Sequence, residues 1–195
     1  MIHQRQSDAG RARAAYRRAL AGARKIGEAR ITASALSNLG VLDADDGRPN
    51  DALDAFRQAR AIFTDLGAHT EVTRAAWGIG FTLLSVARYT AAIPVLRDAR
   101  QQLRMLSLPE EAGIAGVDLV HAYLAVQQHN AARRLLLAVI EEFRTSGLNE
   151  GALDGLQYLH DVLPEARPET ARHVRTYLSR LRDEPTLRFL PPDGQ

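Results

Sequence analysis

The stretch DALDAFRQARAIFTDLG, residues 51–67, decides the fold. Its apolar residues return every three or four positions, from Ala52 through Phe56 to Ala59, and therefore form one stripe along a helix. Gly67 closes the stretch, because glycine readily takes the left-handed backbone that often ends a helix. The pattern predicts an amphipathic helix that stops at Gly67 and packs one face against a neighbour.

This stretch recurs along the chain at a step of 40 residues. Both the small residue near the start of the helix and the residue that closes it have counterparts at that step. The first series is Ala12, Ala52, Ala92 and Ala132, and the second is Gly27, Gly67, Ser107 and Gly147. A fixed step of this length is typical of solenoid proteins, in which one unit alone buries too little surface to fold.

Another helix is predicted before each amphipathic helix. In ITASALSNLGVLDA, residues 31–44, the residues Leu36, Leu39 and Gly40 recur at helical spacing. The sequence GRP, residues 47–49, then interrupts the pattern with two strong breakers. Each 40-residue unit is therefore predicted to be a helical hairpin.

Residues that often cap helices stand at the expected starts. We expect Asn50 to cap the helix that follows it, with Thr90 and Asn130 as its counterparts, because their side-chain oxygens can accept an open backbone N–H. Ser107 has Glu110 three residues further on, which is the spacing of a capping box. These residues are predicted to begin the helices.

The predicted fold class is all-α, a solenoid of stacked antiparallel helical hairpins, because no sustained period-two alternation indicates a strand. We expect a single domain over residues 1–195. Its predicted parts are the second helix of a partial repeat at 8–28, full repeats at 31–67, 71–107 and 111–147, a divergent terminal helical pair at 150–184, and an extended tail at 185–195.

Composition excludes several classes of protein. The 195 residues include no cysteine, so disulfides, cysteine metal sites and cysteine nucleophiles are impossible. No apolar run approaches the roughly 20 residues that cross a bilayer, and the first residues lack the pattern of a secretory signal. We therefore expect a cytoplasmic protein with no membrane partner. The formal net charge of +2 is weak evidence for binding to nucleic acid.

The glycines of WGIGFTLLSV, residues 77–86, raise the question of a nucleotide site. Gly78 and Gly80 form a G-x-G pair, but Leu83 stands where a dinucleotide-binding loop has its third glycine. No predicted strand precedes the pair, so the phosphate cradle lacks its usual support. Gly80 instead aligns with Gly40, where a small residue lets a neighbouring helix approach.

Segment 22–40 has the outline of a helix-turn-helix, with Arg24, Lys25 and Arg30 as possible phosphate contacts. Gly27, however, stands in register with the glycines that separate the repeats. We therefore expect no nucleic-acid binding by this segment.

No arrangement of side chains predicts catalysis, since the P-loop, nucleophile-elbow, zinc-protease and EF-hand patterns are all absent. Asp118 and His121 share one helical face but lack a further metal ligand, so we expect a polar surface pair. His160 and Asp161 are adjacent and are not expected to face the same way, and Glu141 and Glu142 are expected on a solvated surface. We predict a protein that is not an enzyme, with no catalytic residue, metal site or cofactor.

The pattern A-x-x-x-F-x-x-A at Ala52, Phe56 and Ala59, with Leu39 and Gly40 upstream, resembles the tetratricopeptide repeat (TPR) family. The usual unit of that family has about 34 residues, whereas the longer step of this chain is similar to that of bacterial regulatory TPR domains. The resemblance extends over roughly residues 8–163.

The resemblance implies an inner groove, lined by the first helix of each unit, that binds a peptide or protein segment. Carried onto this sequence, the groove positions of the family include Asn38, Arg74, Trp77, Phe81, Asp118, His121, Gln157 and Tyr158. Trp77 fits packing between repeats as well as it fits exposure in the groove, and both interpretations stay open.

The leading hypothesis is a non-enzymatic scaffold or regulatory TPR module with a protein or peptide partner. The alternative is a sensor domain of a bacterial transcription or signalling regulator that takes a small molecule or a signalling peptide. The sequence leaves open the identity of the partner, the oligomeric state and whether the chain is part of a longer protein.

Overall fold

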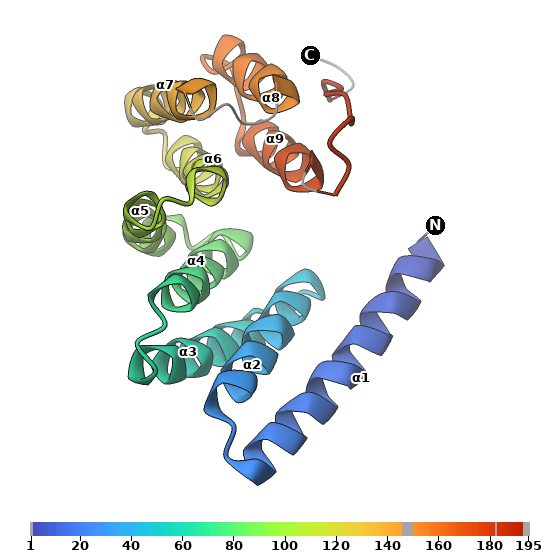
Figure 1. The fold of residues 1–195 in the computed structure, drawn as a ribbon. Helices are drawn as coiled ribbons and strands as arrows, with labels where there is room; N and C mark the ends of the chain where they lie inside the picture. Colours follow the sequence, from blue (N-terminus) through green and yellow to red (C-terminus); the bar gives the residue numbers. More distant parts are fainter. Residues whose placement is uncertain (1, 146–149, 182, 193–195) are drawn as a thin grey trace. The chain divides into compact units, whose positions relative to one another are not determined.

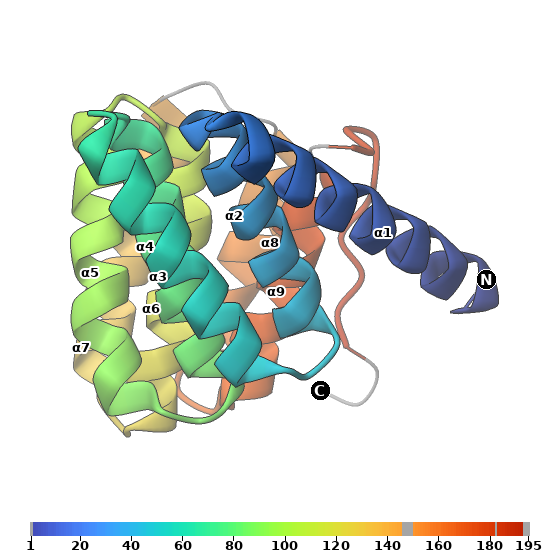
Figure 2. The same ribbon diagram turned by 90° about the horizontal axis from the view of Figure 1, so that it is seen from below.

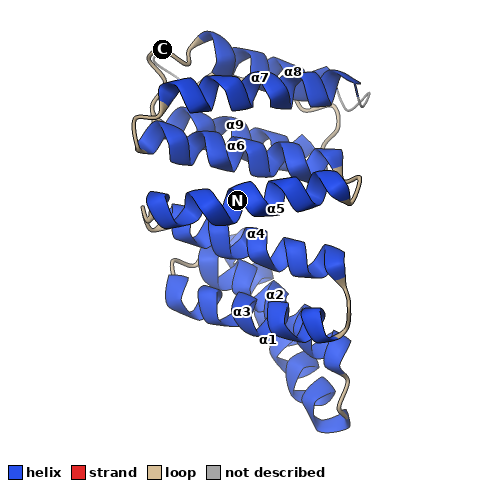
Figure 3. Cartoon of the chain, turned by 90° about the vertical axis from the view of Figure 1, so that its left-hand side faces the viewer, coloured by secondary structure: helices blue, strands red, loops and turns tan. Residues whose placement is uncertain are grey.

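The computed structural model describes residues 2–145, 150–181 and 183–192. These residues contain helices and no strand (Figures 1 and 3), so the all-α prediction is confirmed. The helices are α1 (Ile2–Ile26), α2 (Ala29–Asp45), α3 (Pro49–Asp65), α4 (His69–Ser85), α5 (Tyr89–Met105), α6 (Pro109–Ala125), α7 (His129–Thr145), α8 (Glu150–Asp161) and α9 (Pro168–Leu181).

The chain divides into two compact units, Met1–Ala87 and Arg88–Gln195. The first unit holds α1 to α4 and the second holds α5 to α9. The predicted repeat 71–107 gives α4 to the first unit and α5 to the second. That the chain forms a single domain therefore stays a prediction.

In the first unit, consecutive helices pack side by side as antiparallel neighbours, and α2 also contacts α4 (Figure 1). Ala52, Phe56 and Ala59 of α3 are almost completely buried in its core, as the apolar stripe predicted. Helix α1 begins at Ile2, ahead of the predicted start at residue 8, and Figure 2 shows it extending past the other helices of its unit. The chain thus begins with a longer helix than the repeat pattern indicates.

In the second unit, α6 is the central helix, with α5, α7 and α9 packed against it (Figure 1). Every residue of α6 from Ala112 to Leu124 is buried, because three helices cover its sides. Helix α8 packs against α7 and α9. The terminal pair therefore places its second helix, α9, against α6.

Each of the helices from α2 to α7 has 17 residues, and a short connection separates it from the next. The middle residue of every three-residue connection between them has a positive φ: Gly47, Gly67, Ala87, Ser107 and Gln127. At four of the connections the next residue donates its N–H to a carbonyl five residues earlier, as Ala68 does to Phe63 at 2.9 Å. The left-handed stop predicted at Gly67 is confirmed.

The predicted caps are wrong. Helix α3 starts at Pro49 after Arg48, before Asn50, and no side chain bonds its open N–H groups. Ser107 has a φ of 56° and lies in the left-handed stop of α5, so it cannot cap α6. The tight connection sets the start of each helix, and proline fits the first turn because its missing N–H would have had no partner there.

Candidate functional site

Four of the predicted groove residues lie in the first unit, on the two contacting helices α2 and α4. Asn38 and Arg74 are exposed, and Trp77 and Phe81 are half-buried. Trp77 and Phe81 are one turn apart and therefore lie on the same face of α4. The half-buried state of Trp77 is compatible with packing and with a binding role, and the groove stays a prediction.

The glycines around Trp77 make room for an aromatic ring. Phe56 of α3 packs between α2 and α4, and a Cβ added at Gly40 would lie 3.1 Å from its ring. A Cβ added at Gly78 would lie only 2.6 Å away. The sequence indicated Gly80 as the position that admits a neighbouring helix, yet Gly78 is the glycine that the ring of Phe56 requires to stay bare.

Asp118 and His121 do not form the predicted surface pair. They are 2% and 3% exposed, because α9 packs over this side of α6. The Nε of Arg175 on α9 lies 3.3 Å from a carboxylate oxygen of Asp118. The prediction was wrong because the sequence does not show that the terminal helix folds back onto α6.

His121 is buried in a setting that disfavours its charged form. Its Nε2 has no hydrogen-bond partner among the described residues, and its ring lies 6.0 Å from the ring of Tyr89 between centroids. Burial is the main cause that lowers the pKa of His121 to about 4, with a smaller effect of the positive charge of Arg172 in the same direction and of Glu169 in the opposite direction. The imidazole is therefore neutral at pH 7.

The last two predicted groove residues lie on α8. Gln157 is exposed and donates a hydrogen bond of 2.8 Å to Asp161. Tyr158 is half-buried against the ring of Phe189, at 5.1 Å between centroids. Contrary to the sequence-based expectation, His160 does reach its neighbour, since its Nδ1 lies 3.3 Å from the carboxylate of Asp161.

The tail after α9 folds back over the terminal helices. Besides Tyr158, the ring of Phe189 lies 5.0 Å from that of Tyr177 and 5.6 Å from that of His173. The Nε2 of His173 lies 2.8 Å from the carbonyl oxygen of Leu190. The described part of the predicted tail, residues 185–192, is thus non-helical and attached to its own unit.

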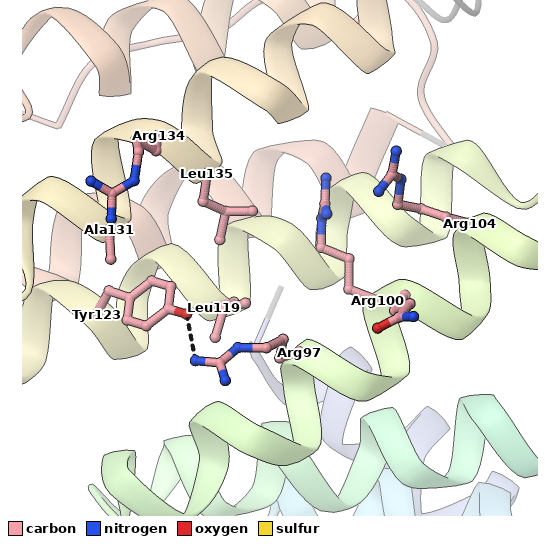
Figure 4. A pocket seen from close by; sticks show the side chains of 9 residues that line it. Arg97, Arg100, Arg104, Leu119, Tyr123, Ala131, Arg134 and Leu135 are labelled. Carbon is pink, nitrogen blue, oxygen red and sulfur yellow. Dashed lines mark hydrogen bonds between the residues drawn. The ribbon is translucent and has the colours of Figure 1, made fainter.

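A basic pocket of about 480 Å³ lies between α5 and α7, over α6 (Figure 4). Its lining residues are Arg97, Arg100, Gln101, Arg104, Leu119, Tyr123, Ala131, Arg134 and Leu135. Arg97 donates a hydrogen bond of 2.9 Å to the hydroxyl of Tyr123, and Arg100 donates to the carboxylate of Glu142 at 2.7 Å. Glu142, expected on a solvated surface, is therefore a half-buried partner of an arginine.

Sequence reasoning missed this basic pocket. The available signal was the spacing of Arg97, Arg100 and Arg104, which are three and four residues apart and share one face of a helix. Such a row alone is usually solvated surface, and Arg134 joins it only through the packing of α7 on α6.

In the described part of the chain, no group of three or more His, Asp or Glu residues could hold a metal ion. No described helix is both long and apolar enough to span a bilayer.

Repeated antiparallel hairpins of equal helices, joined by connections of one kind, define an α-solenoid protein. The family model for the tetratricopeptide repeat matches residues 1–65, from α1 to the end of α3. The resemblance to the TPR family is thereby confirmed over these residues. A search of curated proteins found no match.

Proposed function

We propose that this chain is a non-enzymatic interaction module that binds a peptide or protein segment on α2 and α4 of its first unit. The family match supports this proposal, since TPR proteins are interaction modules. Its binding residues would be Asn38, Arg74, Trp77 and Phe81.

The observation that carries the proposal is the accessible aromatic face of α4. Trp77 and Phe81 are only half-buried, and Arg74, one turn before Trp77 and Gly78, is exposed on the same helix. Aromatic and arginine side chains contribute most of the binding energy at protein interfaces. An arginine and an asparagine can also bind the carboxylates and carbonyl groups of an extended segment.

Most of the groove residues that the resemblance implied in the second unit are covered by other parts of that unit. Asp118 and His121 are covered by α9, and Phe189 packs against Tyr158. Gln157 is exposed, but its amide already donates a hydrogen bond to Asp161 of the same helix. We therefore centre the proposed site on α2 and α4.

We also propose a cytoplasmic role within a bacterial regulatory assembly. The absence of cysteine supports a reducing compartment, and the 40-residue step supports the likeness to regulatory TPR domains.

The test begins with an array of peptides overlaid with the purified chain. Each bound peptide is then titrated in solution by the fluorescence of Trp77, the only tryptophan of the chain. We expect the variant Arg74→Ala/Phe81→Ala to weaken binding at least tenfold, while Arg57→Ala/Leu66→Ala, which changes exposed residues of α3 and its C-terminal end, binds like the wild type.

Equal affinities of the two variants for every bound peptide would refute the proposed site. Thermal unfolding of Trp77→Ala separates the two interpretations of the tryptophan, with the binding of this variant read from the peptide array because it has no tryptophan to report on a titration. A normal Tm with lost binding supports a contact with the partner, and a large fall in Tm supports core packing.

A further inference from the structure

We propose that the basic pocket between α5 and α7 is a second binding site, for an acidic peptide segment in which carboxylates flank an apolar side chain. It lies entirely in the second unit and does not depend on the proposed site on α2 and α4.

The first observation is an excess of positive charge. Four guanidinium groups line the pocket, and no Asp or Glu is among its lining residues. Glu142 is the carboxylate shared by Arg100, at 2.7 Å, and Arg104, at 3.1 Å. Arg97 bonds to a neutral hydroxyl, and Arg134 has no ion-pair partner in the described part of the chain. Two of the four cations are therefore available to an incoming anion.

The second observation is that Arg100 is buried, with 9% of its surface exposed. Burying a guanidinium is costly, and arginine is almost never buried without a partner. The structure makes room for it at Gly116, where an added Cβ would lie 3.0 Å from Nε of Arg100 and 2.6 Å from Val139. The Nε itself has no hydrogen-bond partner among the described residues. A bare glycine and a carboxylate thus hold a cation at the edge of the pocket.

The third observation concerns the surface next to the basic pocket. A second hollow, of about 430 Å³, lies at the start of α7 and shares Ala131 and Arg134 with the basic pocket. The first turn of α7 holds no acidic residue, so the positive end of its helix dipole is not offset there. The two hollows therefore adjoin at Arg134, beside the positive end of the α7 helix dipole.

The lining favours a peptide over a nucleic acid. Single-stranded nucleic acids bind where bases stack on exposed aromatic rings. The aromatic residue of the pocket, Tyr123, is 8% exposed, and its hydroxyl is bonded to Arg97 (Figure 4). Ala131 and Leu135, which are half-buried, instead offer apolar surface between the arginines. Carboxylates fit the planar fork of arginine, and an apolar side chain fits the surface between them.

The probe is a fluorescein-labelled octapeptide in which pairs of acidic residues alternate with single leucines, titrated with the full chain by fluorescence anisotropy. We expect the charge reversal Arg97→Glu/Arg134→Glu to raise the Kd at least tenfold, because it replaces the two available cations with carboxylates that repel the peptide. The contact between Arg100 and Glu142 is not changed by these substitutions. The matched control Arg57→Glu/Arg60→Glu makes the same change of net charge on exposed positions of α3. It should change the Kd less than threefold.

Three further arms keep the proposal open to refutation. Thermal unfolding must show that the charge-reversal variant is folded. The milder variant Arg97→Gln/Arg134→Gln must also bind the peptide more weakly than the wild type. An octapeptide with asparagine in place of leucine should bind at least threefold more weakly, and equal binding would overturn the role of the apolar side chain. Equal loss in the control variant would overturn the site. Stronger binding of a thymidine oligonucleotide or of pyrophosphate than of the peptide would overturn the choice of ligand.

Discussion

The ring of Phe56 lies against Gly78, so closely that a Cβ on this glycine would come within 2.6 Å of it. Overpacking a core of this kind costs about 1–3 kcal/mol. Alanine gains at most about 1 kcal/mol over glycine in helix propensity. The contact therefore outweighs the intrinsic preference of the helix.

We predict that Gly78→Ala lowers the free energy of unfolding by about 1–2 kcal/mol, measured by urea denaturation. Gly22→Ala is the matched control, because an added Cβ at this helical glycine meets nothing within 4 Å. It should leave stability unchanged or raise it. A Gly78→Ala protein as stable as its control would show that the ring of Phe56 can move aside.

The ion pair between α6 and α9 gives a second prediction. Asp118 is buried, whereas the side chain of Arg175 is 27% exposed, so we expect Asp118→Asn to cost about 1–3 kcal/mol. A double-mutant cycle with Arg175→Gln measures the coupling of the two residues. Additive losses would mean that the ion pair contributes nothing to the docking of α9.

Stability should fall in mild acid because of His121. Its pKa is about 4 in the folded chain against the ordinary histidine value of 6.5 in the unfolded chain, so between these values the unfolded chain takes up a proton that the folded chain excludes. The contribution of neutral His121 to the free energy of unfolding is complete above pH 6.5 and is lost as the pH falls to about 4, which lowers that free energy by up to about 3 kcal/mol. Urea denaturation at pH 7.5 and pH 4.5 should show a smaller loss for His121→Asn than for the wild type. An equal loss in both proteins would contradict the assignment to His121.

The tail can be tested through its aromatic residue. Phe189 contacts the rings of Tyr158, Tyr177 and His173, so we expect Phe189→Ala to reduce stability by about 1–2 kcal/mol and to speed hydrogen exchange in α8 and α9. Leu190→Ala is the control, since the side chain of Leu190 is exposed and its carbonyl remains to accept from His173. Exchange rates that match between the two variants would show that the ring does not hold the tail.

The 40-residue step predicted the helices because apolar spacing and the glycine stops agree with each other. It did not predict that the helices from α2 to α6 all end at a residue with the same left-handed backbone conformation. The sequence indicates this conformation at Gly47 and Gly67, because glycine favours it. Ala87, Ser107 and Gln127 occupy the same position, but their residue types give no such signal. At Ser107 a capping-box spacing therefore suggested the wrong role.

The site was less predictable than the fold, because the apolar pattern of a helix shows which face is buried but not which other helix packs against it. Asp118 and His121 are polar and look like surface residues until α9 covers them. Arg100 likewise becomes buried through contacts with Gly116 and Glu142 from two other helices. Both environments depend on contacts between helices that are not neighbours in the sequence.

The equal length of the helices from α2 to α7 has a consequence for how such a chain can evolve. One helix of 17 residues and its connection take up half of the 40-residue step. Since neighbouring helices are antiparallel, a deletion or duplication of one half would place every later helix in the role of its predecessor, with its apolar stripe on the wrong side. A gene encoding this fold can therefore be lengthened or shortened by recombination only in whole hairpins, and an engineer who changes its length should cut and join in the same steps.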